Sequence, residues 1–193
     1  MFLIRIGAVM LPALLLISCG LQEPQCLGRT LTKEQYPRGD IEISSSADLA
    51  KLEGVVCLGG TLSIAKSDLE AVDASKIMQL RALDVQDNPR LTAVDVSGLA
   101  VPPSNTHVLN NARLETLEIP GEGEAQLLDV EFNTALRKGD RTATTRLQSA
   151  LLLNHNINLK SVDAPSLTEV AGELAIWNND SLASLTGLSR VAR

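Results

Sequence analysis

The chain has 193 residues, a formal net charge of −6 and 45% hydrophobic residues, of which very few are aromatic. This length suits a single domain with a substantial core. Because aromatic residues are scarce, Leu, Val, Ile and Ala must fill that core. The acidic balance argues against nucleic acid as a partner, since a surface that binds nucleic acid needs clustered Lys and Arg.

Residues 1–18 have the features of a secretory leader, with Arg5 before an apolar run at positions 6–17 that is too short to span a bilayer comfortably. The run ends in Leu16-Ile17-Ser18-Cys19, which resembles the lipobox of bacterial lipoproteins. The resemblance implies cleavage before Cys19, a diacylglyceryl thioether on its sulfur and a stable anchor in the cell envelope. No Asp follows Cys19, which by analogy with enteric lipoproteins favours the outer membrane. Plain secretory cleavage and an uncleaved anchor are the alternatives.

Residues 19–38 show no periodicity and are interrupted by proline and glycine, so we expect a tether and an N-terminal cap. If Cys19 carries the lipid, Cys26 and Cys57 remain as an even pair in an oxidising compartment. We predict a disulfide between them that fastens the cap to the first repeats. Two thiols without a nearby His make a poor zinc site, and we expect neither a metal nor another cofactor.

From residue 39 to residue 193, one pattern recurs every 22 or 23 residues. An apolar residue, any residue and a second apolar residue come first. After two more residues comes an Asn. Further apolar residues follow three and six places after this Asn. The five pattern asparagines are Asn88, Asn111, Asn133, Asn156 and Asn179. Upstream, Ser46 and Ser67 occupy the Asn position. The sequence therefore predicts about seven coils with a leucine-rich-repeat period.

Each coil reads as a short strand followed by a corner. The alternation around Leu83 and Val85 is typical of a strand with one buried face. The Asn amide both donates and accepts, so stacked copies can satisfy backbone groups at the corner. One coil cannot bury its apolar stripe alone, and stacking therefore predicts a β-rich solenoid with a parallel sheet. An ordinary α/β domain would need the matched asparagines to arise by accident. The fifth coil departs from the pattern, because Gly139 replaces its last apolar residue.

The segments 87–91 (Asp-Asn-Pro-Arg-Leu) and 172–188 resemble the receptor L domain, the leucine-rich, right-handed β-helix module of insulin- and epidermal-growth-factor-type receptors. Similar repeats occur in bacterial surface lipoproteins. The resemblance implies a right-handed β-helix over residues 39–193. It implies little about the ligand, because one fold serves many functions.

Residues that alternate with the buried ones must face outwards from the sheet. They are acidic in the middle coils and become apolar towards the C-terminal end. This candidate binding face consists of Asp84, Gln86, His107, Leu109, Asp129, Glu131, Leu152, Asn154 and Trp177. His155, beside a pattern Asn, is interpreted as a turn residue.

Three interpretations of this face compete. It could bind a protein, with Trp177 and the leucines as anchors. It could be a passive structural face. It could also belong to a carbohydrate-active β-helix enzyme that uses paired carboxylates, or His107 and an acid could bind a metal. A shallow sheet offers a catalytic pair no pocket, and neither outward column has a Lys or Arg. We therefore predict a non-catalytic protein-binding module, periplasmic or surface-facing.

The last coil offers a second surface for association. Leu182, Leu185 and Leu188 are followed by only a short polar tail, so this coil lacks a polar cap. Its strand would expose open backbone groups that favour pairing. A partner, a contact with a second copy or a truncated gene would each explain such an end.

Overall fold

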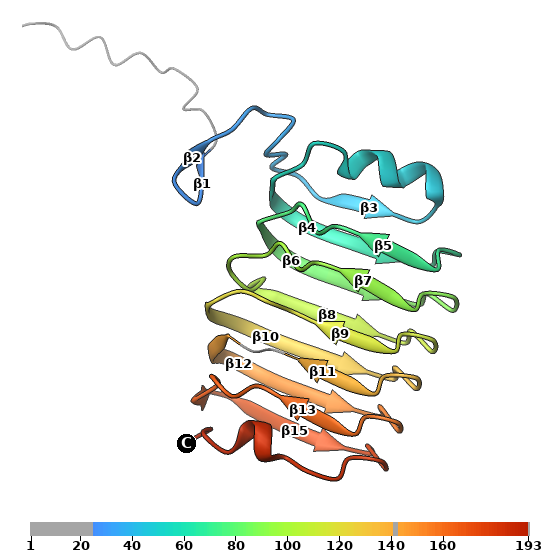
Figure 1. The fold of residues 1–193 in the computed structure, drawn as a ribbon, viewed down its shortest axis with the longest axis vertical. Helices are drawn as coiled ribbons and strands as arrows, with labels where there is room; N and C mark the ends of the chain where they lie inside the picture. Colours follow the sequence, from blue (N-terminus) through green and yellow to red (C-terminus); the bar gives the residue numbers. More distant parts are fainter. Residues whose placement is uncertain (1–24, 141–142, 193) are drawn as a thin grey trace, which may run out of the picture.

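The computed structural model describes residues 25–140 and 143–192, so the leader and Cys19 lie outside the described residues. The repeat strands form one parallel sheet in which neighbours along the chain are neighbours in space (Figure 1). Its strands are β3 (Ile41–Ile43), β4 (Cys57–Ala65), β6 (Gln79–Gln86), β8 (Asn105–Leu109), β10 (Gly123–Glu131), β12 (Thr144–Asn154), β14 (Glu169–Val170) and β15 (Glu173–Trp177). Because β14 and β15 both pair with β12, the eight strands make seven rungs, joined by six turns of the chain.

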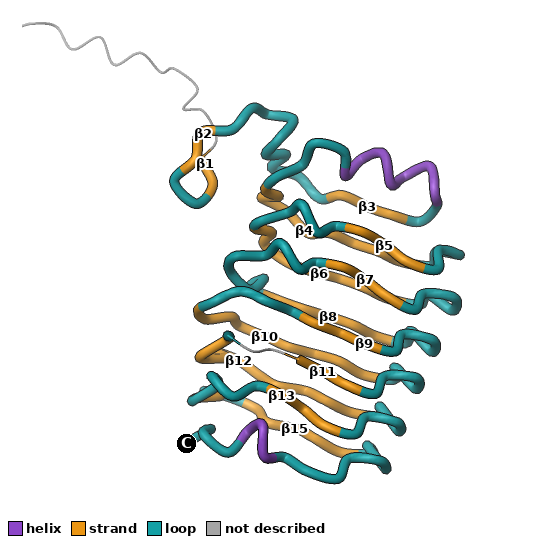
Figure 2. The backbone as a smooth tube through the Cα atoms, in the orientation of Figure 1, coloured by secondary structure: helices purple, strands orange, loops and turns teal. Residues whose placement is uncertain are grey.

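A second layer of short strands runs behind this sheet. It contains β5 (Ala71–Asp73) paired with β7 (Ala93–Asp95), and β9 (Thr116–Glu118), β11 (Lys138–Asp140) and β13 (Ser161–Asp163) paired in that order. Every pairing in both layers is parallel. The tube drawing shows the strands of each rung joined by loops at both edges (Figure 2). The architecture is therefore the predicted β-solenoid with a parallel sheet.

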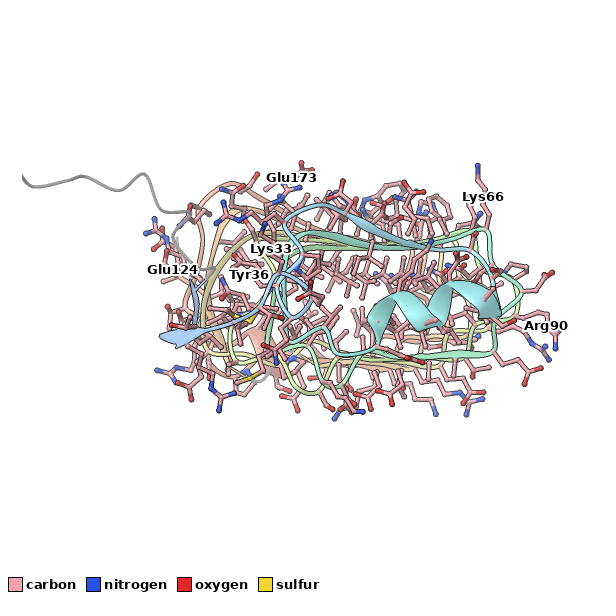
Figure 3. All side chains as sticks on the ribbon, turned by 90° about the horizontal axis from the view of Figure 1, so that it is seen from above. Lys33, Tyr36, Lys66, Arg90, Glu124 and Glu173 are labelled. Carbon is pink, nitrogen blue, oxygen red and sulfur yellow. A yellow bond between two sulfur atoms is a disulfide. The ribbon has the colours of Figure 1, made fainter. Side chains whose placement is uncertain are left out.

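The core lies between the two layers, where side chains fill the interior when the solenoid is seen along its axis (Figure 3). Inward-facing leucines of successive rungs, such as Leu62 and Leu83, and the residues three places after the Asn, such as Leu91 and Leu114, are fully buried. They belong to one continuous cluster. Complete burial of each leucine contributes about 1.5–3 kcal/mol, and stacking adds these contributions along the axis.

The first rung is closed by a short helix. The helix η1 (Ser46–Leu52) lies across the end of the solenoid (Figure 1), where Leu49 and Leu52 pack against the core. Its cap is Ser45, and Asp48 accepts hydrogen bonds from the backbone N–H groups of Ser44 and Ser45 at 3.0 and 2.9 Å. Ser46 therefore begins a helix here and does not form the corner that the pattern predicts.

The other small elements lie at the ends. The strands β1 (Gln25–Cys26) and β2 (Arg29–Thr30) form a hairpin before the first rung. A disulfide joins Cys26 to Cys57 at the start of β4, and so fastens this hairpin to the second rung. The helix η2 (Thr186–Leu188) follows the last rung and buries Leu188.

The repeat asparagines form a hydrogen-bonded column inside one corner of the solenoid. In each step, the backbone N–H of one Asn donates to the side-chain oxygen of the next, at distances of 3.0–3.2 Å. Each side-chain NH₂ donates to a backbone carbonyl of the preceding rung, as Asn111 does to Val85 at 2.9 Å. Ser67 starts the column by donating its hydroxyl to Asn88. Backbone groups that the corner would leave unpaired in the dry interior are satisfied in this way.

The residue before each column position adopts the left-handed backbone conformation. Its φ lies between 53° and 58° at Lys66, Asp87, Asn110, Phe132, His155 and Asn178. For residues with a Cβ atom this conformation costs about 1–2 kcal/mol. The column stabilises the corner against that cost. The side chains of these six residues consequently line up along one outer edge, the corner edge, where Lys66 points away from the solenoid (Figure 3).

The solenoid has one packing defect. Gly139, on β11, stands where neighbouring rungs have Leu117 and Val162. A cavity of about 30 Å³ lies beside it and is lined almost entirely by apolar side chains, including Leu136 and Leu147. The irregular fifth coil therefore keeps the regular backbone path but lacks the side chain that would fill the interior.

Candidate binding face

The outward residues of the main sheet align in two rows across the rungs. In the first row, His107 lies between Asp84 and Asp129 in neighbouring strands. In the second row the order is Gln86, Leu109, Glu131, Asn154 and Trp177. The nine predicted residues therefore share one side of the sheet, with Leu152 next to Asp129.

The polar side chains of this face are linked in pairs. Gln86 donates from Nε2 to Oδ1 of Asp84 at 2.5 Å. Nδ1 of His107 lies 3.4 Å from Oδ2 of Asp129. Each pair uses part of the hydrogen-bonding capacity of a carboxylate and fixes its orientation. The face is consequently an ordered polar surface.

Asp129 is the acid of the face whose carboxyl is held in an unfavourable environment for a charge. Its burial, followed by the charge of Glu131, raises the pKa of Asp129, and the hydrogen bond with His107 opposes this shift. Its second oxygen, Oδ1, is buried and has no hydrogen-bond partner among the described residues. A buried anionic oxygen without a donor is costly. Because the fold encloses Oδ1, Asp129 adds negative charge to the face without offering this atom to a partner.

Asn154 differs from its expected role as a contact residue. It is 3% exposed, donates from Nδ2 to Oε1 of Glu131 at 2.5 Å, and accepts at Oδ1 from the backbone N–H of Trp177 at 3.3 Å. The flanking side chains cover it, so Asn154 positions Glu131 and the end of β15. Alternation correctly places it on the outer side, but alternation cannot show how far the neighbours cover it.

An aromatic cluster at the corner edge adjoins this face, and we call Phe132, His155 and Trp177 the corner cluster. The Phe132 and His155 rings stack with centroids 4.3 Å apart and planes at 11°. The Trp177 ring meets His155 edge-on at 4.4 Å. Phe132 remains 46% exposed and Trp177 52% exposed, so two of the few aromatic rings of the chain face solvent.

Sequence reasoning identified Trp177 but missed Phe132, and interpreted His155 only as a turn residue. His155 does occupy a left-handed turn position, but it also connects the other two rings. A signal for this contact was present. Phe132 and His155 each immediately precede a repeat Asn, so equivalent positions in adjacent rungs must bring them together.

The acids that follow Val in the second layer serve the turns. Asp73 accepts from the backbone N–H and hydroxyl of Ser75 at 2.9 and 2.6 Å, and Asp95 accepts from the N–H of Ser97 at 2.9 Å. Such turns are the usual role of Asp two residues before the donor. These acids have a local structural role, and the candidate binding face is on the other layer.

No family model, curated protein or solved structure matches this chain. The fold defines it as a β-solenoid with parallel strands. Within residues 25–140 and 143–192, no three His, Cys, Asp or Glu side chains are grouped so that they could hold a metal ion. The helices found in the same part of the chain are too short or too polar to cross a membrane.

Proposed function

We propose that this protein is a lipid-anchored protein of the bacterial cell envelope that binds another protein through the candidate binding face. The observation on which the proposal depends is the half-exposed corner cluster beside an ordered polar sheet. Exposed Trp is among the residues that dominate the binding energy of protein interfaces. A rigid solenoid also holds its contact residues in place before binding, which lowers the entropy cost of association.

The lipid anchor is supported by the leader and the Cys19 motif. Cys26, which the disulfide joins to the solenoid, is seven positions after Cys19 in the sequence. A fully extended chain of this length reaches at most about 25 Å. With a lipid on Cys19, the N-terminal end of the solenoid would stay close to the membrane. The partner would then be a protein that lies at the membrane surface or extends to it.

Site-specific cross-linking in native membranes tests the proposal. A photoreactive residue replaces Trp177, and a matched probe replaces Glu118, which is exposed on the opposite layer. We expect one saturable protein product from position 177 and none from position 118.

A third probe separates the two candidate interfaces. Leu185 is 48% exposed beside the last coil, whereas Leu188 is buried and would be a poor reporter. A product from position 185 alone would move the interface to the end of the solenoid. Absence of a specific product at both 177 and 185 would favour a passive structural lipoprotein.

A further inference from the structure

The candidate binding face has acids but no cations. Asp84, Asp129 and Glu131 lie within it, and none of its nine residues is Lys or Arg. Asp84 and Asp129 are two strands apart, about 10 Å, and Asp129 and Glu131 are two residues apart on one strand, about 7 Å. At such distances the three carboxylates repel one another, and a positively charged partner would relieve that repulsion.

Two arginines on strands of the same sheet, nearer the start of each strand, have acidic partners outside the face. Arg146 on β12 lies 3.0 Å from Glu169, and Arg81 on β6 lies 3.7 Å from Asp40. The Arg81 side chain is 59% exposed and that of Arg146 is 41% exposed, so each pair is screened by water. Their pairing leaves the carboxylates of the face without an arginine from these two neighbours.

The neutral hydrogen-bonding groups around Trp177 are either committed or, like Nδ1 of His155, buried and closed to a ligand. The Asn154 amide bonds to Glu131 and to the backbone of Trp177, and the Nε2 of His155 lies 2.9 Å from the Asn178 amide. A neutral sugar would need such groups as well as an aromatic ring. The carboxylates of Asp84 and Glu131 each have one oxygen in a hydrogen bond, to Gln86 and Asn154, and their negative charge is the capacity that remains for a ligand.

The corner cluster supplies a second attraction for cations. An arginine or lysine placed over an aromatic ring is attracted by its π electrons, most strongly over Trp. In the second row, Asn154 separates Trp177 from Glu131 by one strand on each side, so ring and carboxylate are about 10 Å apart. One extended segment can reach both, because its alternate side chains are about 7 Å apart.

We propose that the partner presents a cationic, extended segment, whose Lys or Arg side chains pair with Glu131, are attracted by the charge of Asp129 and stack on the exposed Trp177 ring. This inference rests on the proposed function and specifies the chemistry of the partner. The segment lies across the sheet from the acidic middle rungs to the corner cluster. Its affinity depends on charge, so salt weakens it.

Trp177 is the single tryptophan of the chain, so its fluorescence reports directly on this site. The purified protein is titrated with a heptapeptide of alternating Gly and Arg, with the same peptide containing uncharged citrulline, and with maltohexaose. We expect a saturable fluorescence change with the Arg peptide alone, and weaker binding as salt concentration rises. A response to citrulline equal to that to Arg, or a saturable response to maltohexaose alone, overturns the inference.

A matched pair of variants locates the charge requirement. Glu131→Gln keeps an acceptor for Asn154 and removes the charge, and should weaken Arg-peptide binding about tenfold. Glu118→Gln removes the same charge from the opposite layer and should leave binding unchanged. Equal effects of the two variants would mean that binding depends only on the net charge of the protein, which contradicts a defined site. If no probe binds but cross-linking at position 177 still captures a protein, the proposed function stands and the cationic segment is wrong.

Discussion

The side-chain NH₂ of Asn88 donates to Oδ1 of Asn111 across 2.9 Å, although 23 residues separate the two asparagines. Both are fully buried. The contact is one step of the asparagine column, in which every member satisfies backbone groups of the preceding rung. Buried networks of this kind are costly to break, because the remaining members lose their partners in a dry environment.

Removal of one column member should therefore destabilise the whole solenoid. Asn111→Ala removes the amide donor to the carbonyl of Val85 and the acceptor of the Asn88 N–H, and it takes one of two donors from the carbonyl of Leu109, which keeps the N–H of Asp87. We expect a loss of about 3 kcal/mol or more in the free energy of unfolding. Asn158→Ala is the control, because Asn158 is exposed and donates only to Thr134. Urea denaturation should show a change of at most about 0.5 kcal/mol for the control, and similar losses in the two variants would argue against the column.

The cavity beside Gly139 predicts a stabilising substitution. A Cβ atom at Gly139 meets no atom within 4 Å, so Gly139→Ala adds a methyl group without a clash. It also reduces the freedom of the unfolded chain. We expect a gain of about 1 kcal/mol, measured as a higher urea midpoint.

Gly98→Ala is the matched control for this prediction. A Cβ atom at Gly98 would lie 1.9 Å from the carbonyl oxygen of Ser75 in the preceding rung. The rungs would have to separate, and we expect clear destabilisation. The opposite signs of two Gly-to-Ala substitutions test the interior packing. Destabilisation by Gly139→Ala would show that the cavity is filled or absent in solution.

The disulfide should stabilise the N-terminal end. Cys26 and Cys57 are 31 residues apart, and the loop-entropy relation gives about 3–4 kcal/mol for a loop of this length. Reduction with dithiothreitol, or the double variant Cys26→Ser and Cys57→Ser, should lower the denaturation midpoint. Limited proteolysis should then cut first before residue 57. A midpoint that does not change on reduction would mean that the cap contributes nothing to the solenoid.

Asp129 predicts an unusual pH dependence. Burial and then Glu131 raise its pKa above the ordinary 3.8, so the folded state binds this proton more tightly than the unfolded state. Asp129 therefore lowers stability at neutral pH, and this penalty disappears as pH falls through the raised folded pKa towards 3.8. We expect Asp129→Asn to be more stable than the parent at pH 7, with the advantage lost near pH 3.5. Thermal unfolding of Asp129→Asn and the parent at both pH values measures this difference in stability.

Asp48 has a pKa shift in the direction opposite to that of Asp129. Hydrogen bonds from Lys51 first, and then from Ser44 and Ser45, lower the pKa of this partly covered carboxyl well below its usual range. Its stabilising effect is present above the unfolded pKa of 3.8 and is lost as pH falls through the lowered folded pKa. Asp48→Asn should consequently destabilise the protein at pH 7. If both variants shifted stability in the same direction, the environments described for the two acids would be wrong.

The proposed envelope anchor predicts covalent lipid on Cys19. Cells grown with radiolabelled palmitate should yield a labelled protein, and the mature form should partition with membranes. Cys19→Ser should abolish both the label and the membrane attachment, because the thiol is the acceptor of the lipid. Cys57→Ser controls for loss of an unrelated thiol and should retain the label. A labelled Cys19→Ser variant would refute lipidation at this position.

Much of the architecture could be predicted from the sequence, because its causes are local to each coil. The Leu-x-Val alternation predicts a strand with one buried face. An Asn at every 22 or 23 residues predicts the corner, and its recurrence predicts stacking into a parallel sheet. The missing apolar residue at Gly139 already indicated where the interior would be irregular. The outward positions also followed, because side chains in a strand alternate between its two faces.

The remaining features depended on contacts between residues of different rungs. Burial of Asn154 follows from its flanking neighbours Glu131 and Trp177, and the corner cluster exists because left-handed turns line up Phe132 and His155. Ser46 begins a helix because Leu49 and Leu52 cover the open end of the core. A repeat determines the period and the inward face of every coil through local backbone geometry. Exposure, ring contacts and the burial that raises the pKa of Asp129 depend on neighbouring rungs, about 22 residues away in the chain, and only stacking brings those rungs together.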